Sequence, residues 1–217
     1  MESDLREENI CLVNDCKLDE DQPAFVRRFY YKQLDGYIAP VWFSALKDLN
    51  NEPDDCIYLA VKMRKQTDKT HPEYALLQLP VNLVGRFVQL PSRGNQHFIM
   101  YIDDVVRCTL PLIFAGINYT IFEAYAFKFT KDAEMEIDND LRNGLLQKIS
   151  KGVKSRKCGQ AMRVIYDAHM PKDVLKRVLG KLNIDKLDTV LASGRYQNHR
   201  DLMKFHDCGR TDLKYPQ

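Results

Sequence analysis

INYTIFEAYAFKFTKDAEMEID, residues 117–138, is the stretch from which the fold can be built outward. Its side chains alternate between two sides at every second position, which predicts a β-strand. The bulky side carries Tyr119, Ile121, Tyr125, Phe127 and Phe129, and the opposite side carries Ala124, Ala126 and Thr130. The eleven residues from Tyr119 to Phe129, at about 3.3 Å each, span roughly 35 Å, so we expect this segment to be the central strand of a domain. The bulky side should form a core, and a helix should lie close against the small side.

Upstream of this strand, the sequence predicts three helical stretches and five strands. Residues 2–10 read as the end of a helix, and a short strand follows at 10–13. Asp19 is expected to cap a helix that Gly36 ends. Four β-rich runs come next, at 57–64 and 74–80 and then in RFVQLP and QHFIMYI. Asp103 is predicted to cap a further helical stretch, which Pro111 must kink or divide.

Downstream of the central strand, the pattern changes to alternating helix and strand. A helix is expected from Asp138, because Leu141, Leu145, Ile149 and Val153 recur at every fourth position. A strand at 160–166 and a helix with Pro171 at its first position follow, and SGRYQNHRDLMKF reads as a turn and a short helix. Strands first, then strands and helices mixed, indicate the α+β class, with a mixed, mostly antiparallel sheet packed with helices.

Composition limits the classes of function. The 217 residues are 45% hydrophobic and carry a net charge of +2, so the chain can bury a core but has no overall field that favours nucleic acid or membranes. We predict no nucleic-acid partner. The six cysteines lack zinc-ligand spacing and no signal peptide precedes them, which indicates reduced thiols and a cytoplasmic location. No apolar run approaches the ~18 residues of a membrane span.

The charge is segregated along the chain. Residues 148–181 contain ten Lys or Arg and two Asp, a local balance of +8 that leaves −6 for the remainder. Within this segment, Lys151, Lys154, Arg156 and Lys157 can face a polyanion, since Lys and Arg pair with phosphate oxygens. The alternative is a solvated helix end. Arg93, in the glycine turn before QHFIMYI, is a weaker candidate for an anion contact.

Motifs for catalysis are absent. The sequence contains no G-x-x-x-x-G-K-[ST], G-x-G-x-x-G, H-E-x-x-H or G-x-S-x-G, so no residue is predicted to be catalytic. His97, on a predicted strand, is read as a structural histidine in preference to a catalytic one. The acids at 132–140 can be magnesium ligands or a helix N-terminus, and the second interpretation is favoured, so no metal site is predicted.

Four blocks of the sequence, in this order and spacing, resemble the middle or "head" domain of bacterial polyphosphate kinase. They are FVQLPSRGNQHFIMYIDDVVR, AYAFKFTKDAEMEID, VIYDAHMPKDVLKRVLGKL and GRYQNHRDLMKF. The resemblance implies a fold akin to phosphohistidine phosphatases, with residues 1–22 as the end of a connection from a helical domain and 23–217 as the middle domain. Our own count gives one more early strand than that fold has.

The resemblance also implies a function. The family reversibly transfers the terminal phosphate of ATP to inorganic polyphosphate, with ATP and Mg bound by the parent enzyme. Its phosphohistidine belongs to phospholipase-D-like domains, and this chain has no H-x-K triplet of the kind expected there. We therefore expect an isolated chain without catalytic activity and without a cofactor of its own. Its partners would be the N- and C-terminal domains of the parent, a second subunit and inorganic polyphosphate, with peripheral membrane association of the parent as a further option.

Two positions depart from the family pattern. Pro111 stands where the family continues a helix, and Lys131 stands where Arg is common, which keeps the charge but loses the guanidinium fork. Lys131 is still a candidate for a phosphate contact. Two alternatives to a polyphosphate contact are an interaction domain with an aromatic surface, including Tyr30, Tyr31, Tyr37 and Trp42, and a phosphohistidine-directed hydrolase that uses His97.

Overall fold

The computed structural model describes residues 2–19, 21–49, 52–54, 56–68, 70–131, 161–184, 189–205 and 208–209. Helical segments separate groups of one to three strands along the chain, and two of the helical segments are a π-helix and a 3-10 helix. In chain order they are α1 (Glu2–Glu7), β1 (Ile10–Val13), α2 (Gln22–Phe29), the π-helix η1 (Tyr30–Leu34), β2 (Val41–Trp42), β3 (Tyr58–Arg64), β4 (Glu73–Gln78), α3 (Val81–Val84), β5 (Phe87–Arg93), β6 (Gln96–Tyr101), α4 (Ile102–Ile113), β7 (Ile121–Lys131), β8 (Ala161–Asp167), α6 (Lys172–Leu182), β9 (Val190–Ser193) and the 3-10 helix η4 (His199–Lys204).

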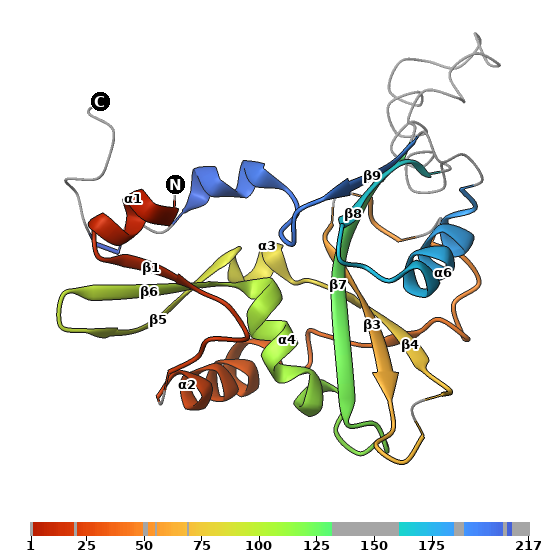
Figure 1. Cartoon of the computed structure of the whole chain (residues 1–217), viewed down its shortest axis with the longest axis horizontal. Coiled ribbons are helices and arrows are strands. Elements are labelled where there is room, and N and C mark those ends of the chain that lie inside the picture. Colours follow the sequence, from red (N-terminus) through yellow and green to blue (C-terminus); the bar gives the residue numbers. More distant parts are fainter. Residues whose placement is uncertain are drawn as a thin grey trace, which may run out of the picture.

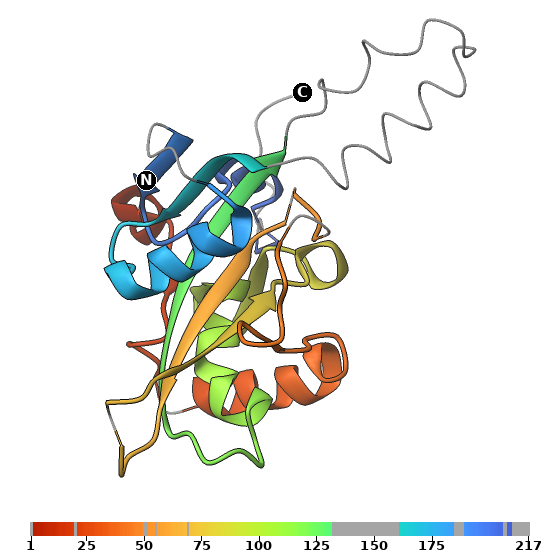
Figure 2. The same cartoon turned by 90° about the vertical axis from the view of Figure 1, so that its right-hand side faces the viewer.

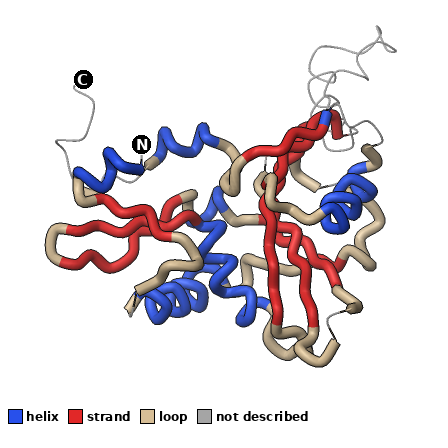
Figure 3. Tube along the Cα trace, viewed as in Figure 1, coloured by secondary structure: helices blue, strands red, loops and turns tan. Residues whose placement is uncertain are grey.

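The described strands form two sheets (Figures 1 and 3). One has six strands in the order β2-β4-β3-β7-β8-β9, and the other has three in the order β1-β6-β5. Pairing is antiparallel except between β1 and β6 and between β8 and β9. The α+β class and the mixed, mostly antiparallel pairing are therefore confirmed. The described strands are divided between two such sheets.

The chain leaves the large sheet at α3. This short helix follows β4 directly, and Gly85 after it has φ of +82°, a left-handed conformation that glycine adopts without a steric penalty. The turn directs β5 and β6 into a hairpin whose only other described neighbour is β1. Local alternation predicted both strands correctly, but it carries no information on which sheet a strand joins.

The prediction of a central strand at β7 is confirmed. β7 pairs with β3 on one side and with β8 on the other, in the middle of the six-stranded sheet. Its bulky side packs Phe127 and Phe129 onto the ring of Tyr58, in a core that α6 closes with Val174 and Val178. Its small side faces the second core.

That second core lies beneath α2 and α4. Figure 2 shows these two helices on one side of the large sheet and α6 on the other. Arg107 of α4 donates from Nε to the carbonyl oxygen of Ala124 at 3.1 Å, so the helix does approach the small side of β7 closely. The charge at Glu123, which interrupts the bulky side of β7, has partners too: Arg64 of β3 binds it, and the Tyr125 hydroxyl donates to it at 3.1 Å.

Several predicted helix ends need correction. The residue before α2 is Asp21, and Asp19 instead pairs with Arg93; α4 begins after Tyr101, so Asp103 lies inside its first turn. The helix continues through Pro111 to Ile113, so no second helix begins at this proline. A proline so near the end removes only one intrahelical hydrogen bond. Pro171 is the residue before α6 rather than its first residue.

The short final helix is confirmed as η4. The helix expected from Asp138 lies outside the described residues. Among the residues that the structure describes, no helix is long and apolar enough to cross a membrane.

Candidate functional site

Two of the basic residues predicted to contact phosphate, Arg93 and Lys131, differ in exposure and in their hydrogen-bond partners. Arg93, at the end of β5, pairs with Asp19 at 3.0 Å and has a side chain that is 43% exposed. Lys131, at the end of β7, is only 7% exposed, and its Nζ donates to the carbonyl oxygen of Glu52 at 2.6 Å. Its backbone N–H donates to Asp54 at 3.2 Å. The structure thus brings Lys131 against the 52–54 segment and leaves Arg93 at the hairpin tip.

The remaining candidates, Lys151, Lys154, Arg156 and Lys157, lie outside the described residues, as do the acids at 132–140. Within the ranges that the structure describes, no group of three or more His, Cys, Asp or Glu could hold a metal ion.

The structure places the residues of the two alternative hypotheses as follows. Tyr30 is buried and Trp42 packs on Phe114, whereas Tyr31 and Tyr37 are 53% and 64% exposed. The ring of His97 contacts the Ser92 hydroxyl at 3.1 Å and makes no other hydrogen bond to a described residue. The geometry therefore gives the hydrolase hypothesis no support.

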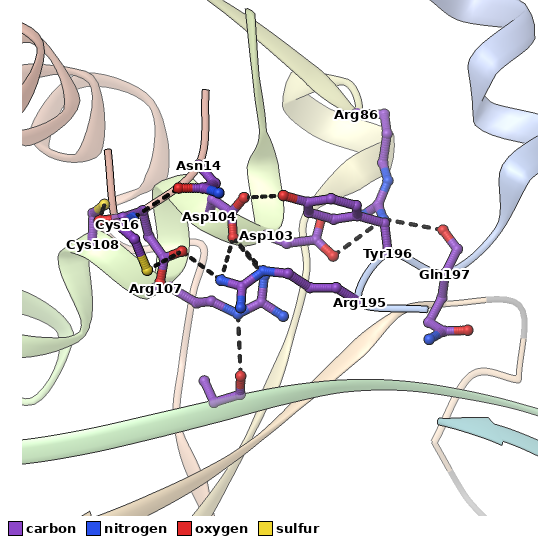
Figure 4. Close-up of polar contacts among 12 residues, drawn as sticks. Asn14, Cys16, Arg86, Asp103, Asp104, Arg107, Cys108, Arg195, Tyr196 and Gln197 are labelled. Carbon is purple, nitrogen blue, oxygen red and sulfur yellow. Dashed lines mark hydrogen bonds and ion pairs between the residues drawn. The ribbon is translucent and has the colours of Figure 1, made fainter. Parts of the chain in front are cut away.

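A cluster that sequence reasoning did not single out is centred on Asp104 (Figure 4). Its side chain is fully buried in the first turn of α4. Oδ1 accepts hydrogen bonds from Arg107 Nη1 at 2.7 Å and from Arg195 Nη2 at 2.9 Å and Nε at 3.3 Å. Oδ2 accepts the Tyr196 hydroxyl at 2.6 Å. Arg195 Nη2 also donates to Asp15 at 2.5 Å, so residues from three distant parts of the chain meet at the guanidinium of Arg195.

Asp103, the neighbouring residue, anchors a second ion pair. Arg86 binds it, and both side chains are buried. Arg86 also donates to the backbone carbonyl of Gln197 at 3.1 Å and lies 3.4 Å from the carboxylate of Asp201. Both acids of the DD pair in α4 therefore hold the segment 195–201.

The electrostatics of the cluster follow from burial and pairing. Burial raises the pKa of the Asp103 carboxyl against the opposing effect of Arg86. Burial, together with the charge of Asp104, raises the pKa of the Tyr196 hydroxyl, which keeps it a hydrogen-bond donor. Burial works to lower the pKa of Arg195, but Asp104 and Asp15 together raise it above its usual value. The Arg195 guanidinium thus stays charged.

Aromatic ring contacts also join the segment after β9 to β5 and β6. Tyr196 stacks on Tyr101 with ring centroids 3.9 Å apart, and Phe87 lies 4.9 Å from Tyr101 and 4.9 Å from Phe205. Stacked and edge-on rings add stability beyond the area that they bury. A cavity of about 330 Å³ lies beside these rings, between α1, β1 and the 194–202 segment.

The cluster works as an attachment site. Ion pairs and ring contacts fix residues 195–205, which follow β9 of the large sheet, onto α4, β5 and β6. The sequence carried one signal for it, namely two adjacent aspartates in an apolar helix with Arg107 three residues after Asp104. Buried charges at that spacing form a pair.

Comparison with known proteins identifies what this chain is similar to. The family model described as the polyphosphate kinase middle domain matches residues 21–205. The polyphosphate kinase of Vibrio parahaemolyticus (serotype O3:K6) is 32% identical over 209 residues, which cover 94% of this chain and 30% of that protein. The polyphosphate kinase of Escherichia coli (strain K12) is 31% identical over 209 residues, again 94% of this chain and 30% of that protein.

A solved structure agrees in fold. The crystal structure of polyphosphate kinase from Porphyromonas gingivalis superimposes with a TM-score of 0.78 at 23% identity and covers 100% of this chain and 30% of that one. The chain thus spans about 30% of the length of the curated relatives that it matches.

Proposed function

The chain belongs to the family described as the polyphosphate kinase middle domain, and on that premise we propose that it serves phosphate transfer between ATP and inorganic polyphosphate as a structural part. In this role it contacts the polyphosphate chain and neighbouring subunits, while the chemistry takes place on other domains. In the same proposal, ATP and Mg are bound by the kinases that this chain resembles. We propose a cytoplasmic location as well, because six scattered cysteines without zinc-ligand spacing suit a compartment that keeps thiols reduced.

The observation that carries the proposal is the segregation of charge. Residues 148–181 hold a balance of +8 in a chain whose total is +2. In the part of this segment that the structure describes, Lys172, Lys176 and Arg177 of α6 are exposed. A polyanion gains from several cations at once, because each neutralised phosphate releases counterions.

Each candidate residue has its own place in the proposal. Lys151, Lys154, Arg156 and Lys157 carry the main contact. Arg93 can reach a phosphate by leaving Asp19, since both side chains of this pair are partly exposed. Lys131 would have to give up the carbonyl of Glu52, so we expect Lys131→Ala to weaken polyphosphate binding less than a change in the basic segment.

Titration of long-chain polyphosphate into this chain tests the proposal. We expect saturable binding at low ionic strength that weakens steeply as salt is added, because screening and counterion release both act against it. Absence of binding at low salt would contradict the polyphosphate contact.

A second candidate function is an interaction domain without any polyphosphate contact. The exposed rings of Tyr31 and Tyr37 favour it, because aromatic side chains are enriched at protein interfaces. Sedimentation over a concentration series separates the two: self-association that is lost in Tyr31→Ser, Tyr37→Ser supports this candidate. A chain that stays monomeric at high concentration counts against it.

A further inference from the structure

Residues 194–205, which we call the strap, are attached to the fold without entering its apolar cores. Among the strap residues only Gln197 is buried. No apolar side chain of the strap belongs to either core or packs against it. Tyr196 and Phe205 instead pack on the rings of Tyr101 and Phe87. The strap therefore lacks the core packing that stabilises the two sheets.

Polar contacts near its start fasten the strap to the rest of the chain. Arg195 Nη2 donates to Asp104 at 2.9 Å and to Asp15 at 2.5 Å, and the Tyr196 hydroxyl donates to Asp104 at 2.6 Å. Figure 4 shows both side chains converging on Asp104. Arg86 donates to a backbone carbonyl of the strap at 3.1 Å. Since water can replace each of these partners once the strap detaches, the net stabilisation from each hydrogen bond is small.

The attached strap also keeps charged groups away from water. The side chains of Asp103 and Asp104 are 0% exposed, and that of Arg86 is 2% exposed. Buried charges carry a desolvation penalty that pairing offsets only in part. Because the strap contacts both Arg86 and Asp104, its detachment lets water reach these groups. This hydration lowers the free energy that opening requires.

Detachment of the strap leaves the sheets paired. β9 comes directly before the strap, and it pairs with β8 from Val190 to Ser193. α4, β5 and β6 keep their packing in the first core, to which the strap contributes nothing. A segment with few buried apolar contacts opens before the elements that form a core. The cavity of about 330 Å³ beside α1 and β1 loses the wall that the strap provides.

We propose that the strap is a clasp, which opens as one unit while both sheets stay folded. Opening breaks the contacts of Arg195 and Tyr196 and frees the carboxylates of Asp104 and Asp15 together with the ring of Tyr101. The clasp concerns the fold of this chain alone, so it does not depend on the polyphosphate contact proposed above.

Hydrogen exchange of the natural chain, followed by NMR over a series of urea concentrations below the unfolding transition, tests the clasp. The amides of Asp201 and Phe205 report on the strap, because they donate to the carbonyl oxygens of Asn198 and Leu202 at 3.0 Å each. Without urea, we expect both to exchange at least about a hundredfold faster than the amides of β3 and β7. Their exchange should also respond less to urea, because opening the strap exposes little surface.

Two tyrosine variants separate opening of the strap from global unfolding. Tyr196→Phe keeps the ring stack but loses the hydrogen bond to Asp104, so it should accelerate exchange at the two strap amides about tenfold. Tyr125→Phe is the matched control, since it removes a hydroxyl that donates to the carboxylate of Glu123 in β7. That contact survives when the strap opens, so the control should leave both strap amides unchanged.

The same variants distinguish the clasp from fraying of the 3-10 helix η4. Both reporter amides lie in η4 or directly after it, whereas residue 196 lies before it. Tyr196→Phe therefore accelerates their exchange only if the strap opens as one unit. No acceleration in Tyr196→Phe, or equal acceleration in both variants, would overturn the proposal. So would a single exchange free energy and urea slope shared by the strap and β7, a result that needs no variant to fold.

Discussion

Asp104 shows how one residue can organise a region. Its buried carboxylate accepts hydrogen bonds from Arg107, Arg195 and Tyr196, and no part of its side chain is exposed. Removing such a charge from water is unfavourable by several kcal/mol, and only good geometry and full hydrogen bonding offset that penalty. The cluster should therefore be sensitive to the loss of any member.

Asp104→Asn should destabilise the chain by about 3–5 kcal/mol, because it leaves the buried Arg107 guanidinium without its counter-charge. Urea unfolding of the two proteins measures the difference. Asp21→Asn is the control: that side chain is 85% exposed and 3.9 Å from Arg93, so its change should stay within about 0.5 kcal/mol. Similar losses in both variants would mean that the buried cluster contributes no more than a surface pair.

Cys108 on α4 provides a chemical probe of the same region. Burial, with smaller contributions from Asp15 and Asp104, raises the pKa of its thiol to about 12 from a usual value of 9.0. Since only the thiolate reacts, Cys108 should stay unmodified at pH 8 while the exposed Cys16 reacts with a disulfide reagent within minutes.

Mass spectrometry after timed labelling distinguishes the two cysteines. Added urea should release the reaction at Cys108, because unfolding exposes the thiol and restores its ordinary pKa. Equal rates at Cys16 and Cys108 in the absence of urea would show that α4 does not bury this thiol.

At the scale of elements, local sequence patterns predicted whether a segment forms a helix or a strand, but not which sheet a strand joins. The alternation in β7 predicted the central strand and the side that packs against α4, because period-two burial is a property of consecutive residues. The runs RFVQLP and QHFIMYI were also predicted as strands. Their separation into a second sheet depends on α3 and on β1, which pairs in parallel with β6 from far away in sequence, so no local pattern could indicate it.

Gly85 tests the turn that separates the two sheets. Its φ of +82° disfavours any residue with a Cβ, so Gly85→Ala should destabilise the chain by about 1–2 kcal/mol. Gly180→Ala makes the same change inside α6, where no atom apart from its chain neighbours and the helix's own backbone lies within 4 Å of the added carbon, and it should stabilise by about 0.5–1 kcal/mol. Thermal unfolding of both variants should give shifts of opposite sign. If Gly85→Ala does not lower the stability, the assignment of a strained turn at Gly85 is contradicted.

At the scale of the whole molecule, sequence reasoning recovered the class and the family more fully than the site. Long blocks in register identified the family, and its model matches residues 21–205. The attachment of residues 195–205 to α4 was not predicted, because it depends on contacts between residues as distant as Asp15 and Arg195. Only the adjacent acids Asp103 and Asp104 in an apolar helix hinted at buried partners.

The same limit applies to the phosphate contacts. Charge along the sequence indicates that residues 148–181 are basic, but not which of these side chains share one face. Burial then separates residues that look alike in sequence: Lys131 is enclosed beside Glu52, while Arg93 stays at a hairpin tip.

The proposed polyphosphate contact is tested most directly by charge reversal. Lys151, Lys154, Arg156 and Lys157 are all changed to Glu, and a control protein carries the same change at Lys17, Lys32, Lys47 and Lys204, which are exposed and lie outside the 148–181 segment, so the two variants have equal net charge. Titration with long-chain polyphosphate at low salt should show lost or strongly weakened binding in the first variant and a smaller decrease in the control. Equal weakening in both would contradict a contact at the basic segment and indicate attraction by net charge alone.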